Sequence, residues 1–325
     1  MRKFVVPIVA LTGIALLSPH ADAANLFIKS RAATPGHPVS LPVLVNGVGG
    51  TTQLWGVDLA LTYDAAKLAA VNDATTGAAF TPQTVSGSTE TPVVVSGAPT
   101  VGTVVTNPTL YVGYVRGTSA MPTFVGNPVL SGSSPSAAIG LLRLSVAAGT
   151  TQGIVVNLAV PTTYNVANDG TGSTTVARAG ATGATSDVAS GAAVTAETVT
   201  VADYFPNYTA PGSGLDLRVP LHKVAVGLPG DLNTNASGVP DGVINAGDLG
   251  LLAAASVGKT SAAAKWTEYA RIAADVSPAL GYTAANIGGT SGQGYGDGII
   301  NAGDLGLLAA KSVGKPSAAN FPVPE

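Results

Sequence analysis

Two nearly identical segments constrain this chain more than any other feature of its sequence. DGVINAGDLGLLAAASVGK runs from Asp241 to Lys259, and DGIINAGDLGLLAAKSVGK runs from Asp297 to Lys315. Each copy begins with an Asp-Gly turn signal and continues as an Ala/Leu-rich stretch with helical periodicity. Each stretch ends at a glycine, Gly258 or Gly314, as helices often do. The C-terminal part is therefore predicted to be a small helical domain built by duplication.

The residues around each Asp-Gly pair have the spacing of a calcium-binding loop. An EF-type loop takes oxygen ligands from positions 1, 3, 5, 7, 9 and 12, position 7 through its backbone carbonyl, and needs glycine at position 6. If Asp241 is position 5, Gly242 is position 6 and Asp248 is position 12, where a carboxylate also suits a helix start. Oxygen ligands without His or Cys favour Ca²⁺ over transition metals. We predict two Ca²⁺ sites, with ligands Asp231, Asn233, Asp241, Val243, Asn245 and Asp248 in one and Asp275, Ser277, Asp297, Ile299, Asn301 and Asp304 in the other.

Both predicted loops are longer than the standard loop of about 12 residues. Asp231 to Asp248 spans 18 residues and Asp275 to Asp304 spans 30, with the extra residues between positions 3 and 5. Because lengthening a loop costs little entropy, such an insert need not destroy the site if it leaves and returns as a closed excursion. The alternative is that each Asp-Gly pair only makes a turn and that Asp248 only caps a helix.

The first 23 residues have the layout of a signal peptide. The basic start MRK precedes the apolar run Phe4–Leu17, and Ala21–Ala23 forms a small-x-small cleavage site. We therefore predict a signal peptide over 1–23, a mature start at Ala24, and a secreted, extracellular or cell-surface location. The apolar run is too short for a comfortable membrane span, and we predict no span in the mature chain. The chain has no cysteine, so disulfides cannot stabilise it.

Residues 24–201 are predicted to be β-structure. Short runs rich in Val, Leu, Ile, Thr and Tyr are separated by clusters of Gly, Pro, Asn and Ser. Val39, Leu41, Val43 and Val45 recur with a period of two and would share one face of a strand. Many short strands separated by turn signals favour a β-sandwich.

The rest of the chain divides by composition. The Pro-studded residues 202–229 are predicted to be a linker that holds one short strand, followed by the duplicated domain over 230–315 and a tail over 316–325. Between the two copies, SAAAKWTEYARIAA predicts another helix over 261–274.

The duplicated segment resembles the dockerin family, whose members carry two repeats of the form D-x-N-x-D-G-x-[VI]-[ND]-x-x-D-L-x-x-L. GDLN…DGVINAGDLGLL and ADVS…DGIINAGDLGLL match this form over about 230–314, apart from the inserts and Ser277 at position 3. The resemblance implies an F-hand pair of calcium loops and helices that docks on a cohesin partner. The alternative for the small residues of that docking face is that they are only good helix formers. The implied face consists of Ala246, Gly247, Ala253, Ala254, Ala302, Gly303, Ala309 and Ala310.

The N-terminal part resembles a cohesin domain. The resemblance lies in LFIKSRAATPGHPVSLPVLVNG…LWGVDLALTYDAAKL and in the later run AIGLLRLSVAAGTTQGIVVNL. It implies a jelly-roll β-sandwich, one sheet face of which binds a dockerin; related sandwiches bind carbohydrate. The expected fold class is therefore mainly β plus a small α part, with a cohesin-like jelly-roll sandwich followed by the dockerin-like module.

Several function classes are disfavoured by composition. The net charge is −3 and no basic run is present, so nothing favours nucleic acid. After the leader only His37 and His222 remain for acid–base or nucleophilic chemistry, and no phosphate loop or HExxH motif occurs. We therefore predict that the chain is not an enzyme.

The expected function is an exported assembly or scaffold protein. Its partner would be a cohesin- or dockerin-type protein, and a second copy of the chain is one candidate. The alternative is a carbohydrate-binding or adhesive surface protein, tethered through its dockerin-like tail. In that case exposed aromatic residues such as Trp55, Tyr111 or Tyr114 would stack on a polysaccharide.

Overall fold

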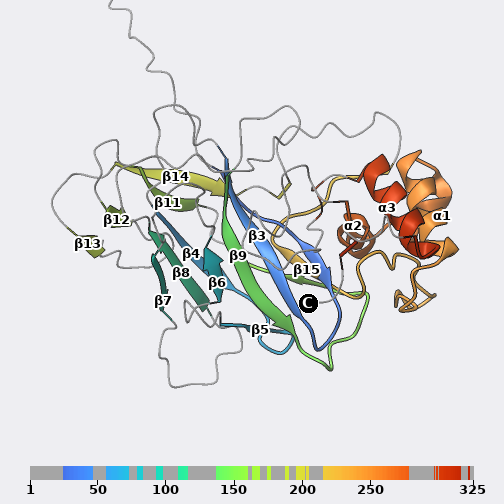
Figure 1. Cartoon of the computed structure of the whole chain (residues 1–325), viewed down its shortest axis with the longest axis horizontal. Coiled ribbons are helices and arrows are strands. Elements are labelled where there is room, and N and C mark those ends of the chain that lie inside the picture. Colours follow the sequence, from blue (N-terminus) through green and yellow to red (C-terminus); the bar gives the residue numbers. More distant parts are fainter. Residues whose placement is uncertain are drawn as a thin grey trace, which may run out of the picture.

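A computed structural model gives the fold of the chain (Figure 1). None of the described helices combines the length and hydropathy that crossing a bilayer requires. The predicted signal peptide and mature start, together with Trp55, Asp297 and Ile299, lie outside the described residues. The structure describes residues 25–46, 56–72, 79–82, 93–97, 109–115, 137–159, 163–168, 174–176, 187–189, 195–201, 203–204, 215–277, 296, 298, 300–315 and 321–322.

The N-terminal part is a curled, mostly antiparallel sheet of 10 strands. Its strands follow the order β5-β9-β3-β1-β14-β11-β4-β8-β7, with β6 paired to β9, and only β1 and β14 run parallel. Together with the helices near the C-terminus, this sheet confirms the predicted fold class of a mainly β chain with a small α part. The sheet comprises β1 Asn25–Ile28, β3 Pro38–Asn46, β4 Gly56–Thr62, β5 Leu68–Ala70, β6 Phe80–Pro82, β7 Val93–Gly97, β8 Thr109–Val115, β9 Ala137–Val146, β11 Thr163–Asn168 and β14 Thr195–Val201.

Strand β3 shows why the alternating pattern of the sequence is incomplete. Val39, Leu41 and Val43 are buried on the predicted face. Ser40, which points to the other side, is buried too, and its carbonyl accepts a hydrogen bond of 2.9 Å from Nη1 of Arg31. Arg31 begins β2 (Arg31–Ala33), which packs against β3. Both faces of β3 are therefore covered, one by the sandwich and one by the segment that leads to the helices.

The predicted linker contributes a strand to a second sheet. Strand β15 (Lys223–Val226) pairs in parallel with β2 and antiparallel with β10 (Val155–Asn157). Val224, Ala225 and Val226 are fully buried. The short strand expected in this segment is present, but the described part of the segment from 215 onward is packed core rather than an exposed connection. A third small sheet pairs β12 (Thr174–Val176) with β13 (Asp187–Ala189).

The helices follow the duplicated sequence. Helices α1 (Ala246–Ser256) and α3 (Ala302–Ser312) begin at corresponding residues of the two copies, and they contact each other. The single helix predicted over 261–274 is wrong: a 3₁₀ turn at Thr260–Ala262 is followed by α2 at Glu268–Ala274. The break occurs because the Thr267 side chain caps α2, accepting from the Ala270 amide at 3.2 Å.

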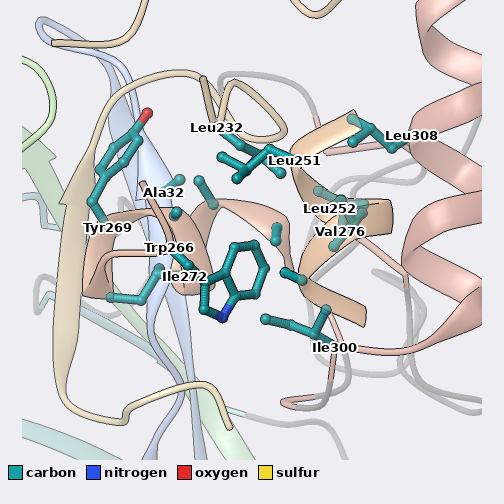
Figure 2. Close-up of a cluster of buried hydrophobic side chains, with 14 of the residues drawn as sticks. Ala32, Leu232, Leu251, Leu252, Trp266, Tyr269, Ile272, Val276, Ile300 and Leu308 are labelled. Carbon is teal, nitrogen blue, oxygen red and sulfur yellow. The ribbon is translucent and has the colours of Figure 1, made fainter. Parts of the chain in front are cut away.

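One hydrophobic cluster, the tail cluster, joins the helices to the small sheet. Ala32 of β2 and Ala225 of β15 belong to it together with residues of all three helices. Figure 2 shows the side chains of Leu251, Leu252 and Trp266 directed into this shared space. The fully or nearly buried members are Ala32, Leu217, Val219, Ala225, Leu232, Leu251, Leu252, Ala255, Ala262, Trp266, Tyr269, Ala270, Ile272, Ala273, Ala274, Val276, Ile300, Leu308 and Phe321.

A polar contact holds α2 to the segment before β15. Asp216 accepts hydrogen bonds from Arg218 at 3.0 and 3.1 Å and from Arg271 of α2 at 2.9 Å, and its carbonyl accepts from Trp266 Nε1 at 2.8 Å. Partial burial alone would raise the pKa of Asp216, but the hydrogen bonds from Arg218 and the charge of Arg271 outweigh it and hold that pKa below its usual value. The helices are thus attached to the sheet by apolar and ionic contacts together.

Truncation of the tail cluster should destabilise the chain. Leu252 is fully buried, so Leu252→Ala should lower the free energy of unfolding by about 2–5 kcal/mol through lost burial and an unfilled cavity. The control Val257→Ala removes a side chain that is 69% exposed and should change little. Urea denaturation measures both; equal effects of the two substitutions would contradict the described packing.

Candidate metal centre

The two predicted metal loops have the same backbone turn at position 6. We call them the first loop (Asp231, Asn233 and Asp241–Asp248) and the second loop (Asp275, Ser277 and 297–304). Gly242 and Gly298 have φ of 79° and 85°, a conformation that favours glycine. The Gly242 amide donates to Oδ2 of Asp231 at 2.7 Å, and the Gly298 amide donates to Oδ2 of Asp275 at 3.0 Å. The structure therefore brings position 1 and position 6 together in both copies.

The aspartate at position 12 closes each loop. Oδ1 of Asp248 accepts from the amides of Leu232 and Asn233, both at 2.7 Å, and its Oδ2 accepts from the Asn245 amide at 2.8 Å. Asp304 makes the matching contacts with Val276, Ser277 and Asn301 at 2.8–2.9 Å. Both side chains are fully buried. Each aspartate thereby joins the residues at positions 2 and 3 of its loop to the start of the following helix. Its carboxylate, which can accept about four hydrogen bonds, accepts these three from backbone amides.

Asn245 and Asn301 at position 9 complete the helix starts. Their side chains accept from the Gly247 and Gly303 amides at 2.6 Å, which forms a capping box with the position-12 aspartate. The expectation that the position-12 residue opens the helix is therefore confirmed, and its role as a metal ligand stays a prediction.

The insert of the first loop is a closed excursion, which is the condition under which it leaves the loop intact. Thr234 and Pro240 form an isolated antiparallel bridge. Inside it, the Asn235 amide donates to the Val239 carbonyl at 2.8 Å, and the Asn235 side chain accepts from the amides of Ser237 and Val239. The chain thus returns to the loop at the residue before Asp241, which leaves positions 3 and 5 at the base of the excursion.

Asp231 carries a buried negative charge that the first loop does not balance. It is fully buried, and Oδ1 has no hydrogen-bond partner within the described part of the chain. Burial raises the pKa of Asp231 to about 6, and the carboxylates of Asp248 and Asp241 act in the same direction, against the backbone hydrogen bonds from Gly242 and Asp241. A buried carboxylate oxygen without a partner in the described residues, under the influence of two further negative charges, is the chemistry that fits a hard cation.

The other oxygen atoms that could bind a metal ion in the first loop accept hydrogen bonds from exposed groups. The side-chain nitrogen of Asn245, Nδ2, donates to Oδ2 of Asp241 and to the Val243 carbonyl, both at 3.2 Å. The Lys265 ammonium donates to Oδ1 of Asn233 at 2.6 Å. Among the described residues, no three side chains of His, Cys, Asp or Glu gather as a ready metal cluster. A bound ion would therefore have to exchange these exposed contacts for its own.

The second loop meets its buried charge in a different way. Oδ2 of Asp275 lies 2.9 Å from Nζ of Lys29, and the two side chains are 1% and 2% exposed. Lys29 comes from the junction between β1 and β2, far from the loop in sequence. The sequence analysis did not predict a role for Lys29 or Lys265. For Lys29, its place within the otherwise apolar run LFIKS indicated that a charged side chain would be buried.

The predicted docking residues lie on the two duplicated helices. Ala246, Gly247, Ala302 and Gly303 are exposed at the helix starts, whereas Ala253, Ala254, Ala309 and Ala310 are half-buried, and Ala254 packs against the tail cluster. The structure also gives the two glycines a local role. A Cβ at Gly247 would meet the Asn233 side chain at 2.9 Å, and one at Gly303 would meet Ser277 Oγ at 2.7 Å. Glycine at these two positions therefore lets the position-3 side chain approach the helix start, and a larger residue would have to displace that side chain.

Comparison with solved structures finds cohesin modules among the similar chains, with TM-scores below 0.3. No family model and no curated protein matches the chain. Similar solved structures include the sixth cohesin of scaffoldin B from Acetivibrio cellulolyticus, in complex with a dockerin (19% identity, 55% of this chain, 99% of that chain, TM-score 0.29). Others are the seventh ScaB type I cohesin of Pseudobacteroides cellulosolvens (14%, 58%, 98%, 0.27) and a cohesin module of a Clostridium perfringens family 33 glycoside hydrolase (12%, 55%, 96%, 0.26).

Removal of one partner of the buried ion pair should be costly. Lys29→Met leaves Asp275 buried without its cation, and Asp275→Asn leaves the ammonium without its anion, so each should lower the free energy of unfolding by about 3–5 kcal/mol. The double variant should lose less than the sum, because it leaves no unpaired charge.

The matched control for this prediction is Lys67→Met. Lys67 pairs with Asp64 at 2.7 Å, but these side chains are 43% and 38% exposed, so the loss should be about 1 kcal/mol or less. Urea denaturation of the four variants measures the difference. If Lys29→Met cost no more than Lys67→Met, the buried pair would not exist in solution.

Proposed function

We propose that the chain is an exported, non-catalytic attachment protein whose helical tail is ordered by calcium. The sheet of 24–201 and the helices of the duplicated segment would provide two surfaces for protein–protein contact, of the cohesin and dockerin kinds that the sequence motifs suggest. The observation that carries the proposal is the buried Asp231 carboxylate, whose Oδ1 lacks a partner in the described residues.

Calcium would act on the first loop by balancing charge. Asp231, Asn233, Asp241, Val243, Asn245 and Asp248 supply oxygen donors, and the ion would replace the Lys265 contact at Asn233 and the Asn245 contact at Asp241. Both contacts are exposed and thus inexpensive to exchange. Since Asp248 joins the loop to α1, stabilising the loop stabilises the start of the helix that carries half of the predicted docking face.

The partner surface would be formed by the starts of α1 and α3. Packing of α2 against β2 and β15 leaves these helix starts exposed, with the small residues Ala246, Gly247, Ala302 and Gly303 outward. Small side chains permit close apolar contact with a partner. If the partner is the sheet of a second copy, the contact is heterologous and produces open chains rather than closed dimers.

Calcium should stabilise the full chain through Asp231. At a calcium concentration of about 100 Kd, one bound ion adds roughly 2.7 kcal/mol to the free energy of unfolding. Asp231→Asn should abolish this gain, and in chelator it should be at least as stable as the unaltered chain, because it removes an unbalanced buried charge. The control Asp64→Asn changes a partly exposed carboxylate elsewhere and should keep the gain. Thermal unfolding in calcium and in chelator measures it; a gain that survives Asp231→Asn would refute the assignment.

Association should depend on calcium and on the helix starts. Light scattering on the full chain should find multi-chain species in calcium and monomers in EDTA. The pair Ala246→Gln and Ala302→Gln should weaken the association at least about tenfold, since longer polar side chains prevent close contact. The control pair Gly250→Ala and Gly306→Ala adds methyl groups that meet nothing within 4 Å on the same helices and should leave association unchanged. A monomer in both conditions would contradict self-association and direct the search to another partner.

A further inference from the structure

The two loops differ at position 1 in how the buried carboxylate is balanced, although the sequence from position 5 onward is nearly the same. In the first loop, Oδ1 of Asp231 has no partner among the described residues. In the second loop, the equivalent residue Asp275 forms an ion pair with Lys29 at 2.9 Å, with both side chains almost completely buried. The same carboxylate position thus lacks a cation in one copy and has one in the other.

Lys29 is held in place by its own backbone rather than by chance contact of a flexible side chain. Its amide donates to the Pro42 carbonyl of β3 at 2.9 Å. The next residue, Ser30, accepts from the Lys223 amide of β15 at 2.8 Å through its hydroxyl. The backbone on both sides of the ammonium-bearing residue is therefore fixed between the two sheets, and the side chain reaches Asp275 at the end of α2.

The contrast with the lysine of the first loop supports this distinction. Lys265 contacts Asn233, a neutral ligand candidate, from an exposed position, so an ion can displace it. Lys29 contacts the position-1 carboxylate itself from a buried position. A divalent ion bound to Asp275 would lie next to a buried ammonium group, and two cations in a site with little water repel each other strongly.

We infer that Lys29 is a built-in cation of the second loop and takes the place of its calcium ion. The full chain would then bind one Ca²⁺, at the first loop, and the second loop would be ordered by the sandwich in the absence of any metal. This inference extends the proposed function, since the single ion is the one assigned there to Asp231. It also makes the tail asymmetric: α1 responds to calcium, whereas α3 is held by Lys29 under all conditions.

Calcium stoichiometry of full-length variants tests the inference. Isothermal titration calorimetry, checked by equilibrium dialysis, should give one Ca²⁺ per chain for the unaltered protein and none for Asp231→Asn. Lys29→Met removes the ammonium with a side chain of similar length and should raise the number to two. The control Lys67→Met removes an exposed lysine and should leave one.

The outcomes separate this inference from the proposed function. Two ions on the unaltered chain, or one ion that survives Asp231→Asn, would overturn the role of Lys29 or of the first loop respectively. No ion on the unaltered chain but one on Lys29→Met would remove the first-loop proposal and support the role of Lys29. If Lys29→Met binds no more calcium than the unaltered chain, the inference fails.

A second pair of variants covers the case in which Lys29→Met does not fold. The double variant Lys29→Met/Asp275→Asn leaves no unpaired charge, and Lys29→Arg retains the cation; both should bind one ion. Asp275→Asn alone should also bind one, because in this account Asp275 is no calcium ligand. Loss of calcium binding in Asp275→Asn would place the ion in the second loop and overturn the inference.

Discussion

A buried carboxylate needs hydrogen-bond donors or a cation, and the helical part of this chain is organised around four of them. Asp248 and Asp304 are satisfied by three backbone amides each, so they can be fully buried without a counter-ion. Asp231 and Asp275 each accept a hydrogen bond from the position-6 glycine amide of their own loop. The remaining charge of Asp275 is met by Lys29, and that of Asp231 has no counterpart in the described residues. This imbalance is the physical basis for expecting a metal ion at the first loop.

The same contacts make the helices part of the sandwich rather than a separate appendage. Lys29, Ala32 and Ala225 all lie outside the duplicated segment, and each contacts it or belongs to its cluster. Tyr269 of α2 donates to the Asp231 carbonyl at 3.0 Å, so α2 connects the small sheet to the first loop as well. A partner bound at the helix starts would consequently be rigidly placed relative to the sheet. Such rigidity suits a protein whose proposed role is to hold other chains in position.

Local sequence was sufficient for features that depend on near neighbours. The duplicated spacing predicted the glycine turns at Gly242 and Gly298 and both helix starts. The low entropy cost of a longer loop allowed the closed excursion between Thr234 and Pro240 without predicting it. Alternation predicted the buried face of β3. These features succeed because a few adjacent residues decide them.

Contacts between distant residues could not be predicted in the same way. The burial of 215–229 depends on pairing with β2 and β10, and the start of α2 depends on a cap at Thr267 together with the burial of Trp266. The pairing of Lys29 with Asp275 joins residues that are far apart in the sequence, and the lysine within the apolar run LFIKS does not indicate which residue is its partner. The two loops therefore share the same pattern of predicted ligand positions but differ in their surroundings.

The position-6 amides provide the most direct measurement of the central claim, that the first loop holds a hard cation at Asp231. The Gly242 amide donates to Asp231 and the Gly298 amide to Asp275, so each reports on the charge of its own position-1 carboxylate. In ¹⁵N-resolved NMR spectra of the full chain, calcium titration should move the Gly242 resonance strongly and leave that of Gly298 nearly unchanged. A Gly242 resonance that does not respond to calcium would contradict the account.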